Sequence, residues 1–360
     1  MQKLSGAVFC TYETAENLTI LDQINDELVS EIANYSVQSD FSGRTDMEKI
    51  KLGVSACLLG HEVRYDGGHK LNHFIRDILG QFADFVPVCP ENECGMGIPR
   101  EALRLTGLPE NPRLLTTRTQ KDCTQQMLDW AQERLNELEK EDLCGFIFKK
   151  DSPSSGLYRV KVYNDSGQAV KNGTGIFAKA FVQRFPLLPV EEDGRLNDAD
   201  LRENFVESIF VFKRLRELVQ KKKSRGALVD FHTRHKLLVM AHSPQHYKIM
   251  GKLVAGTSGS LEEMYADYIR TMAEALRLRA TPRKHINVLQ HIMGYFKKQL
   301  SAGEKQELLE LLEMYRDGHI PLIVPVTMMN HFVRKYEQPY LREQYYLSPH
   351  PLELRLRNHV

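Results

Sequence analysis

Cysteines are the residues whose spacing in this sequence most directly suggests chemistry. Cys89 and Cys94 lie five residues apart in the segment "CPENECG", and Cys57 ends the segment "GVSAC". Cys57 and Cys89 each follow a strand-like apolar run, and Cys94 shares a loop with Cys89, so the three thiolates can face one point. Three soft ligands suit zinc or an iron–sulfur cluster. Simple burial is the alternative for free cysteines, and we prefer it for Cys123 and Cys144.

A site held by only three cysteines has a chemical consequence. A structural zinc site needs a fourth ligand, and the paired short cysteine spacings typical of such sites are absent here. A cluster on three cysteines leaves one iron open, and an open metal position acts as a Lewis acid. The residues alone leave zinc and iron–sulfur both open.

The composition indicates an ordinary soluble globular protein. Hydrophobic residues make up 42% of the chain and charged residues 26%. There is no run of about 18 apolar residues, and the N-terminus lacks the basic start and apolar stretch of a signal peptide. We therefore predict a cytoplasmic protein without membrane contact, in which a disulfide framework is disfavoured.

Strand-like and helix-like segments alternate in the first half of the chain. Strands are expected at residues 50–56, 85–90, 143–149 and 158–164, with helices at 72–83, 123–142 and 175–185. This alternation predicts an α/β domain with a mainly parallel sheet and a Rossmann-like arrangement in three layers. In such sheets, sites form in loops beyond the carboxyl ends of the strands.

The second half of the chain has only helical periodicity. Apolar residues recur at three- and four-residue spacing in the segments 201–222, 260–280, 281–300 and 301–319. We therefore predict an all-α domain over residues 201–360, an α/β domain over 47–200, and an N-terminal extension over 1–46. The extension is interpreted either as a disordered arm or as the product of a misassigned start, with Met47 as the true beginning.

Charge is distributed unevenly between the two halves. Residues 1–200 carry 22 Lys and Arg against 31 Asp and Glu, a net charge of −9, whereas residues 201–360 carry 26 against 16, a net charge of +10. A nucleic-acid backbone is the usual reason for such a basic bias, and a solvated helix surface is the alternative. The candidate RNA-binding residues are Lys221, Lys222, Lys223, Arg225, His232, Arg234, His235 and Lys236.

Three segments of the first half resemble the signature stretches of the thiouracil desulfidase family (TudS-like). They are "GVSACLLGHEVRYDGGHK", "VCPENECGMGIPREALRL" and "GFIFKKDSPSSGLYRVKVY". The later segment "SRGALVDFHTRHKLLVMAHSPQHYKIMGKLV" resembles the domain fused to it in tRNA 4-thiouridine desulfidases (RudS-like). The resemblance extends from residue 50 to about residue 340 and leaves out only the N-terminal extension.

The resemblance implies a 4Fe-4S cluster on three cysteines whose free iron accepts the sulfur of a thiocarbonyl. Cys57 and Cys89 match the family's cluster ligands, Glu91 its acid/base glutamate and Ser152 its catalytic serine. Shorter family members have a third cysteine in "SPSCG", where this sequence has Ser155. Because Cys94 stands where those members need no cysteine, we hypothesise that the third ligand has moved to position 94.

The remaining candidate residues concern the substrate. Arg64, Tyr65 and Asp66, followed by two glycines, offer a cation and a phenol and permit close backbone approach to a base and its phosphate. Ser154 and Ser155 are assigned to substrate binding in the loop that holds Ser152.

The sequence therefore predicts a tRNA 4-thiouridine desulfidase that gives uridine and sulfide, with tRNA as its partner and no protein partner implied. One alternative is a desulfidase of free thiolated bases or nucleosides. The other is a non-catalytic RNA-binding protein whose cysteines hold zinc.

Overall fold

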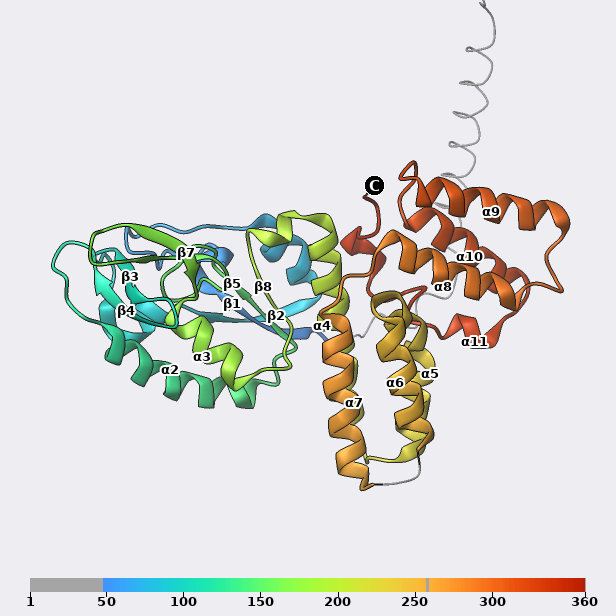
Figure 1. The fold of residues 1–360 in the computed structure, drawn as a ribbon, viewed down its shortest axis with the longest axis horizontal. Helices are drawn as coiled ribbons and strands as arrows, with labels where there is room; N and C mark the ends of the chain where they lie inside the picture. Colours follow the sequence, from blue (N-terminus) through green and yellow to red (C-terminus); the bar gives the residue numbers. More distant parts are fainter. Residues whose placement is uncertain (1–47, 257–258, 360) are drawn as a thin grey trace, which may run out of the picture. The chain divides into compact units, whose positions relative to one another are not determined.

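The computed structural model describes residues 48–256 and 259–359. The predicted N-terminal extension, residues 1–46, lies outside the described residues. Ile50–Val360 form one compact unit that begins with two sheets and continues with helices (Figure 1). The predicted fold class, an α/β region followed by an all-α region, is confirmed. The predicted division near residue 200 stays a prediction.

Sheet A is fully parallel, and it contains the strands that carry the cysteine loops. Its strand order is β2-β1-β5-β8, so β1 pairs with β2 on one side and β5 on the other. Apolar side chains of β1 and β5 are almost wholly buried, as expected for a parallel sheet covered on both faces. The strands are β1 (Ile50–Ser55), β2 (Ala83–Val88), β5 (Gly145–Phe148) and β8 (Val190–Glu192).

Sheet B was not predicted as a separate sheet. Its order is β4-β3-β6-β7, with β3 and β6 parallel and the two outer pairs antiparallel. Only β6 among its strands was expected. The strands are β3 (Leu103–Leu108), β4 (Asn111–Thr116), β6 (Val160–Tyr163) and β7 (Ala169–Gly173).

Helices cover both faces of sheet A. On one face, Phe146 and Phe148 of β5 pack against Phe181 of α3, with ring centroids 4.6 and 5.4 Å apart. Trp130 of α2 contacts Phe177 of α3 at 5.4 Å, so the two helices lie side by side on this face (Figure 1). The helices are α2 (Thr124–Leu138) and α3 (Ile176–Arg184). The segment 72–83, predicted as one helix, forms only two short helical turns.

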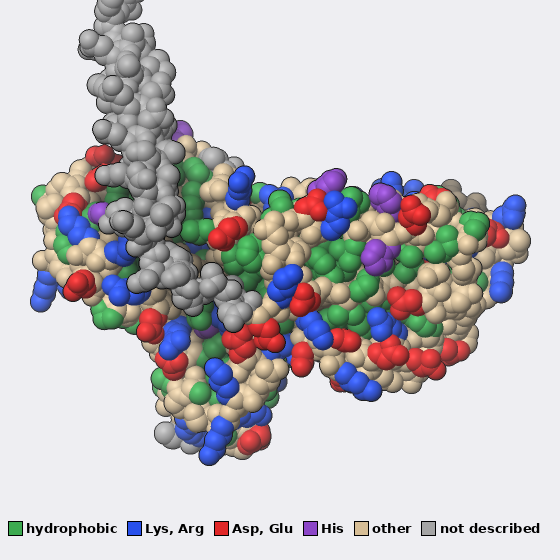
Figure 2. Space-filling view, turned by 180° about the vertical axis from the view of Figure 1, so that it is seen from behind, with side chains coloured by type: hydrophobic (Ala, Val, Ile, Leu, Met, Phe, Trp, Pro, Cys, Tyr) green, Lys and Arg blue, Asp and Glu red, His purple; other side chains and the backbone are tan. Residues whose placement is uncertain are grey.

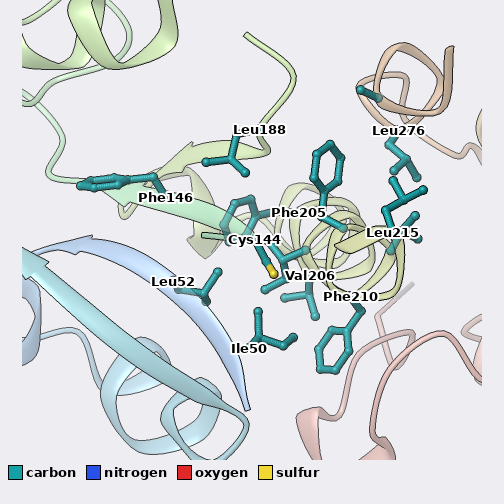
Figure 3. Close-up of a cluster of buried hydrophobic side chains, with 14 of the residues drawn as sticks. Ile50, Leu52, Cys144, Phe146, Leu188, Phe205, Val206, Phe210, Leu215 and Leu276 are labelled. Atoms are coloured by element: carbon teal, nitrogen blue, oxygen red, sulfur yellow. The ribbon is translucent and has the colours of Figure 1, made fainter. Parts of the chain in front are cut away.

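The opposite face of sheet A is covered by α4 (Ala199–Gln220), a helix that we predicted as part of the all-α domain. Phe205, Val206 and Phe210 of α4 lie against Ile50, Leu52 and Cys144 (Figure 3). The approach is close, because a Cβ at Gly145 would lie 2.7 Å from Ile209. Each buried apolar side chain of this kind contributes about 1.5–3 kcal/mol. The three layers are therefore α2/α3, sheet A and α4.

The remaining helices form the all-α region. Ser301 with Glu304 forms a capping box at the start of α9, and Ser260 with Glu263 forms another at α7. None of the helices in the part of the chain that the structure describes is long and apolar enough to cross a membrane. They are α5 (Arg225–His242), α6 (Pro244–Ala255), α7 (Leu261–Leu276), α8 (Pro282–Tyr295), α9 (Ala302–Arg316), α10 (Ile323–Lys335) and α11 (Pro339–Arg342).

A buried ionic network connects the C-terminal segment to α4. The Arg357 guanidinium donates to Glu203 Oε1 at 3.1 Å, to Glu207 Oε1, and to the Tyr346 carbonyl at 2.7 Å. His242 Nε2 lies 3.1 Å from Glu207 Oε2. Although burial by itself raises the pKa of Glu207, Arg357 and His242 outweigh it and hold that pKa well below its usual range.

Replacing Arg357 with Met tests this network. The change leaves two carboxylates buried without their cation, and removing one partner of a buried pair typically costs about 3–5 kcal/mol. We expect a loss of this size in the free energy of unfolding, measured by urea denaturation. Arg355→Met is the matched control, because Arg355 is exposed and also has a left-handed backbone conformation. Equal small losses in both variants would contradict the assignment.

Candidate active site

The loops that follow β1, β2 and β5 meet at one edge of sheet A. Since these strands are parallel neighbours, their carboxyl ends lie together. Cys57 follows β1, Cys89 follows β2, and Lys149 follows β5. All three line a cavity of about 410 Å³. Its further lining includes Arg64, Tyr65, Glu91, Arg100, Ser152 and Ser155. The prediction that the loops of Cys57 and Cys89 meet at one edge of the sheet is confirmed.

The Glu91 carboxylate is the centre of this arrangement. Its Oε1 accepts hydrogen bonds from Ser152 Oγ at 3.3 Å and from Ser154 Oγ. Its Oε2 lies 3.7 Å from an Arg100 guanidinium nitrogen and accepts from the Cys89 thiol at 3.8 Å. Only 14% of the Glu91 side chain is exposed. A carboxylate held this way is positioned to exchange a proton with a molecule in the cavity.

Burial raises the pKa of Cys57 to about 11, of Cys89 to about 12 and of Cys94 to about 11. The nearby Glu91 carboxylate raises the pKa of each thiol further, so Glu91 lies close to all three. These thiols are therefore protonated at neutral pH. A bound metal would have to displace their protons, as metal sites on cysteine generally do.

Helix α2 fixes the loop that carries Cys89 and Cys94. The Cys89 backbone N–H donates to Glu93 Oε1 at 2.7 Å, and Arg134 of α2 lies 3.2 Å from the other Glu93 oxygen. Gln126 of α2 donates to the Cys94 carbonyl at 2.7 Å. The loop is therefore held at both cysteines from outside the cavity.

Cys94 and Ser155 differ in their relation to the cavity. Ser155, which is 3% exposed, lines it together with Cys57 and Cys89. Cys94 does not line it; its thiol donates to the Glu91 carbonyl at 3.5 Å and has Cys123 among its electrostatic neighbours. The structure thus brings Cys57 and Cys89 together in the lining and leaves Cys94 outside it.

Metal-ligating side chains do not gather as they would around one ion. Within residues 48–256 and 259–359, no group of three or more His, Cys, Asp or Glu side chains is placed to hold a single metal ion. A 4Fe-4S cluster has a different requirement, because each thiolate binds a different iron and the thiolates are spaced more widely. Cys57 and Cys89 suit such a cluster in chemistry and in their place in the lining, and Cys94, in the same loop as Cys89, would supply the third thiolate.

Ser154 does not face the cavity as predicted. It is fully buried. Its Oγ donates to Glu91 Oε1 and lies 3.0 Å from Ser152 Oγ. The assignment of Ser154 to substrate binding is therefore wrong, because the side chain has no access to a ligand. It holds Glu91 in place instead. Ser152, in contrast, lies in the cavity lining.

The predicted substrate residues after β1 separate into two roles. Arg64 and Tyr65 line the cavity, and Tyr65 is 44% exposed with the Arg64 guanidinium 5.4 Å from its ring centroid. Asp66 is outside the lining; it pairs with Arg64 at 3.3 Å and accepts from the Gly68 N–H at 3.1 Å. Asp66 therefore orients Arg64.

Sequence reasoning missed the lysine that follows β5. Lys149 Nζ lies 3.0 Å from Asp193 Oδ2, and Lys149 lines the cavity beside Cys57. Its position directly after a parallel strand was a usable signal, since loop residues at that edge are candidates for the site.

The histidines assigned to RNA binding are core residues. His235 is 1% exposed and is stacked between Phe231 and Tyr345, with ring centroids 3.8 and 4.4 Å away. His232 is 6% exposed beside Tyr268, and burial lowers its pKa to about 4. Rings buried in this way cannot stack on a base or contact a phosphate. Both assignments are therefore wrong.

The basic residues assigned to RNA binding lie at or near the surface. Lys221, Lys222 and Arg225 are exposed. Arg234 pairs with Asp230 at 3.2 Å and with Glu343 at 3.3 Å, and these carboxylates compete with an RNA phosphate for its guanidinium. Lys223 and Lys236 are partly buried, each over a tyrosine ring. Figure 2 shows Lys and Arg side chains over the lobe of α5, α6 and α7, with acidic side chains between them.

Comparison with known proteins finds matches in both regions of the chain. The family model of 2-thiouracil desulfurase matches residues 52–193, and that of a protein of unknown function, DUF1722, matches residues 236–351. The uncharacterized protein YbgA of Escherichia coli K12 is 35% identical over 152 residues, which are 42% of this chain and 90% of YbgA.

Two further proteins are similar to less than half of this chain. The uncharacterized protein YbbK of Bacillus subtilis is 28% identical over 135 residues, 36% of this chain and 88% of YbbK. A solved structure of the 4Fe-4S-dependent thiouracil desulfidase TudS is 28% identical, with a TM-score of 0.35 over 43% of this chain and 97% of that one.

Proposed function

We propose that this chain, which belongs to the family of proteins that join a 2-thiouracil desulfurase region to a DUF1722 region, removes sulfur from 4-thiouridine in tRNA. The family assignment supports a desulfidase of thiolated uracil. The observation that carries the proposal is the convergence of Cys57 and Cys89 with Glu91 in one cavity.

The cofactor in this proposal is a 4Fe-4S cluster held by Cys57, Cys89 and Cys94. When bound, the cluster supplies a Lewis-acidic iron for the soft sulfur of the thiocarbonyl, which makes the ring carbon a better target for water. In the net reaction, 4-thiouridine and water give uridine and sulfide. Cys57 and Cys89 in the cavity lining, with Cys94 in the same loop as Cys89, supply thiol groups of the type that iron–sulfur clusters require.

Glu91 acts as the general base and acid. Its carboxylate accepts a proton from the attacking water and later returns one to the departing sulfur or to the base, an effect typically worth about 10²–10⁴ in rate. Ser152 Oγ, 3.3 Å from Glu91 Oε1, lies in the cavity and passes or orients that proton. Buried Ser154 keeps the carboxylate in this position.

Arg64 and Tyr65 bind the nucleotide. Tyr65 offers an exposed ring for stacking on the base, and Arg64, held by Asp66, offers a cation for the adjoining phosphate. A base stacked inside tRNA cannot reach the cavity and has to be flipped out at a cost of a few kcal/mol. In the proposal, the basic helical region offsets that cost by holding the RNA, chiefly through Lys221, Lys222 and Arg225.

The proposal is tested on the full chain, because α4 covers one face of sheet A. Protein purified without oxygen and reconstituted with iron and sulfide is given 4-thiouridine in tRNA or as the free nucleoside. We expect loss of the near-ultraviolet band of the thiolated base and a kcat/KM at least about 10-fold higher for tRNA than for the free nucleoside. Added salt should lower kcat/KM for tRNA but not for the nucleoside.

Two results would contradict this function. Faster turnover of the nucleoside than of tRNA would favour the desulfidase of free thiolated bases. Binding of tRNA by a zinc-containing protein that leaves the band intact, even after reconstitution, would favour the binding protein.

The position of the third cluster ligand is tested by comparing Cys94→Ala with Ser155→Ala. We expect Cys94→Ala to lose most of its iron and acid-labile sulfide after reconstitution, because the Ser155 hydroxyl is a poor substitute for the lost thiolate. Ser155→Ala should keep both iron and sulfide. Cys144→Ala, a change at a buried cysteine between sheet A and α4, is the control. Full iron in Cys94→Ala with iron loss in Ser155→Ala would instead assign the third ligand to Ser155.

A further inference from the structure

Sheet B carries a regular arrangement of positive charge that the proposed reaction does not use. Each of its four strands contains one basic residue and no acidic residue. Residues 50–200 as a whole are slightly acidic, with 19 Lys and Arg against 22 Asp and Glu. The four residues are Arg104 of β3, Arg113 of β4, Lys161 of β6 and Lys171 of β7.

The strand register places three of these residues side by side. Lys161 is directly opposite Lys171 in the antiparallel pair of β6 and β7. In the parallel pair of β3 and β6, Leu105 is beside Val162, so the preceding residues, Arg104 and Lys161, are also neighbours. Adjacent strands lie about 4.8 Å apart. We call Arg104, Lys161 and Lys171 the basic row.

The basic row points away from the core. Val160 and Val162, which flank Lys161 in β6, are buried, and so is Leu105 beside Arg104. Because side chains alternate along a strand, the row lies on the opposite, outward face. Lys161 and Lys171 are both exposed. Tyr163 shares that face, and the Arg104 guanidinium lies 5.4 Å from its ring centroid.

The charges of the row have no acidic partner in the part of the chain that the structure describes. Among the described residues, no acidic side chain lies within 4.0 Å of Lys161 or Lys171. Arg104 reaches only the neutral Gln120 Oε1, at 3.0 Å. Like charges directly opposite each other in a sheet are destabilising. A bound polyanion would remove that cost.

The row adjoins the active-site cavity. Leu103, the residue before Arg104, lines the cavity, as do Glu101 and Ala102. Ser155, also in the lining, precedes β6 by five residues. The row is therefore at the ends of β3 and β6 that are nearest to the cavity.

We infer that the basic row binds phosphates of the RNA strand whose thiolated base enters the cavity. The inference rests on the proposed function for the identity of the polyanion, and it places an RNA contact on the α/β region in addition to the helical one. Two lysines and an arginine with no acidic partner among residues 48–256 and 259–359 complement a phosphate backbone, and continuity with the cavity favours the substrate over a separate acidic partner. Tyr163 gives the same face a ring on which an unpaired base can stack.

The test compares Lys161→Gln/Lys171→Gln with Lys140→Gln/Lys305→Gln in the full chain. Lys140 and Lys305 are also exposed, so both double variants lose the same charge from the surface. Binding of tRNA is measured over a range of salt concentrations. Each lost phosphate contact lowers the salt slope by about 0.7–0.9, so the first variant should lose about 1.5–2 from the slope and roughly 10-fold or more in affinity near 0.1 M salt.

Turnover of free 4-thiouridine, measured in parallel, separates this inference from the proposed function. We expect it to be unchanged in both double variants, because a nucleoside has no flanking phosphates. Weaker tRNA binding by Lys161→Gln/Lys171→Gln supports the inference even if no protein removes sulfur, in which case only the proposed function fails. Unchanged tRNA affinity and salt slope in a protein that desulfurises tRNA would overturn the inference and leave the row to an acidic protein partner.

Discussion

The parallel pairing of β1 with both β2 and β5 is the constraint on which the candidate site depends. It brings the ends of three strands together, so that Cys57, Cys89 and Lys149 reach one cavity although they are far apart in the sequence. Parallel strands need both faces covered, and α3 and α4 supply that cover. The Glu91 carboxylate then orders the loops by accepting hydrogen bonds from Ser152 and Ser154.

Helix α4 gives the two regions a shared core. Its apolar side chains pack on sheet A, while its carboxylates Glu203 and Glu207 are neutralised by Arg357 near the C-terminus. The catalytic sheet and the helical region are therefore physically coupled through one helix. This arrangement explains why Cys144 is a packing residue, as the sequence predicted, and not a ligand.

Sequence reasoning located the site better than it assigned individual residues. Apolar runs followed by cysteine identified the edge of sheet A, because the carboxyl ends of parallel strands lie at one edge. Burial was harder to predict. Ser154 and His235 carry polar groups typical of binding sites, yet neighbours distant in sequence, Glu91 and Arg214, satisfy them inside the protein. Three strands of sheet B were missed because β3, β4 and β7 are partly polar, although the alternation in β3 was a usable signal.

The central claim is that Glu91 performs proton transfer beside a cluster that it does not hold. Glu91→Gln tests this most directly, with iron, acid-labile sulfide and turnover of 4-thiouridine measured on the same anaerobic preparation. The account predicts wild-type iron and sulfide with turnover lowered by about 10²–10⁴. Wild-type turnover in a variant that keeps its iron would contradict the claim, because the carboxylate at the centre of the cavity would then have no part in the reaction.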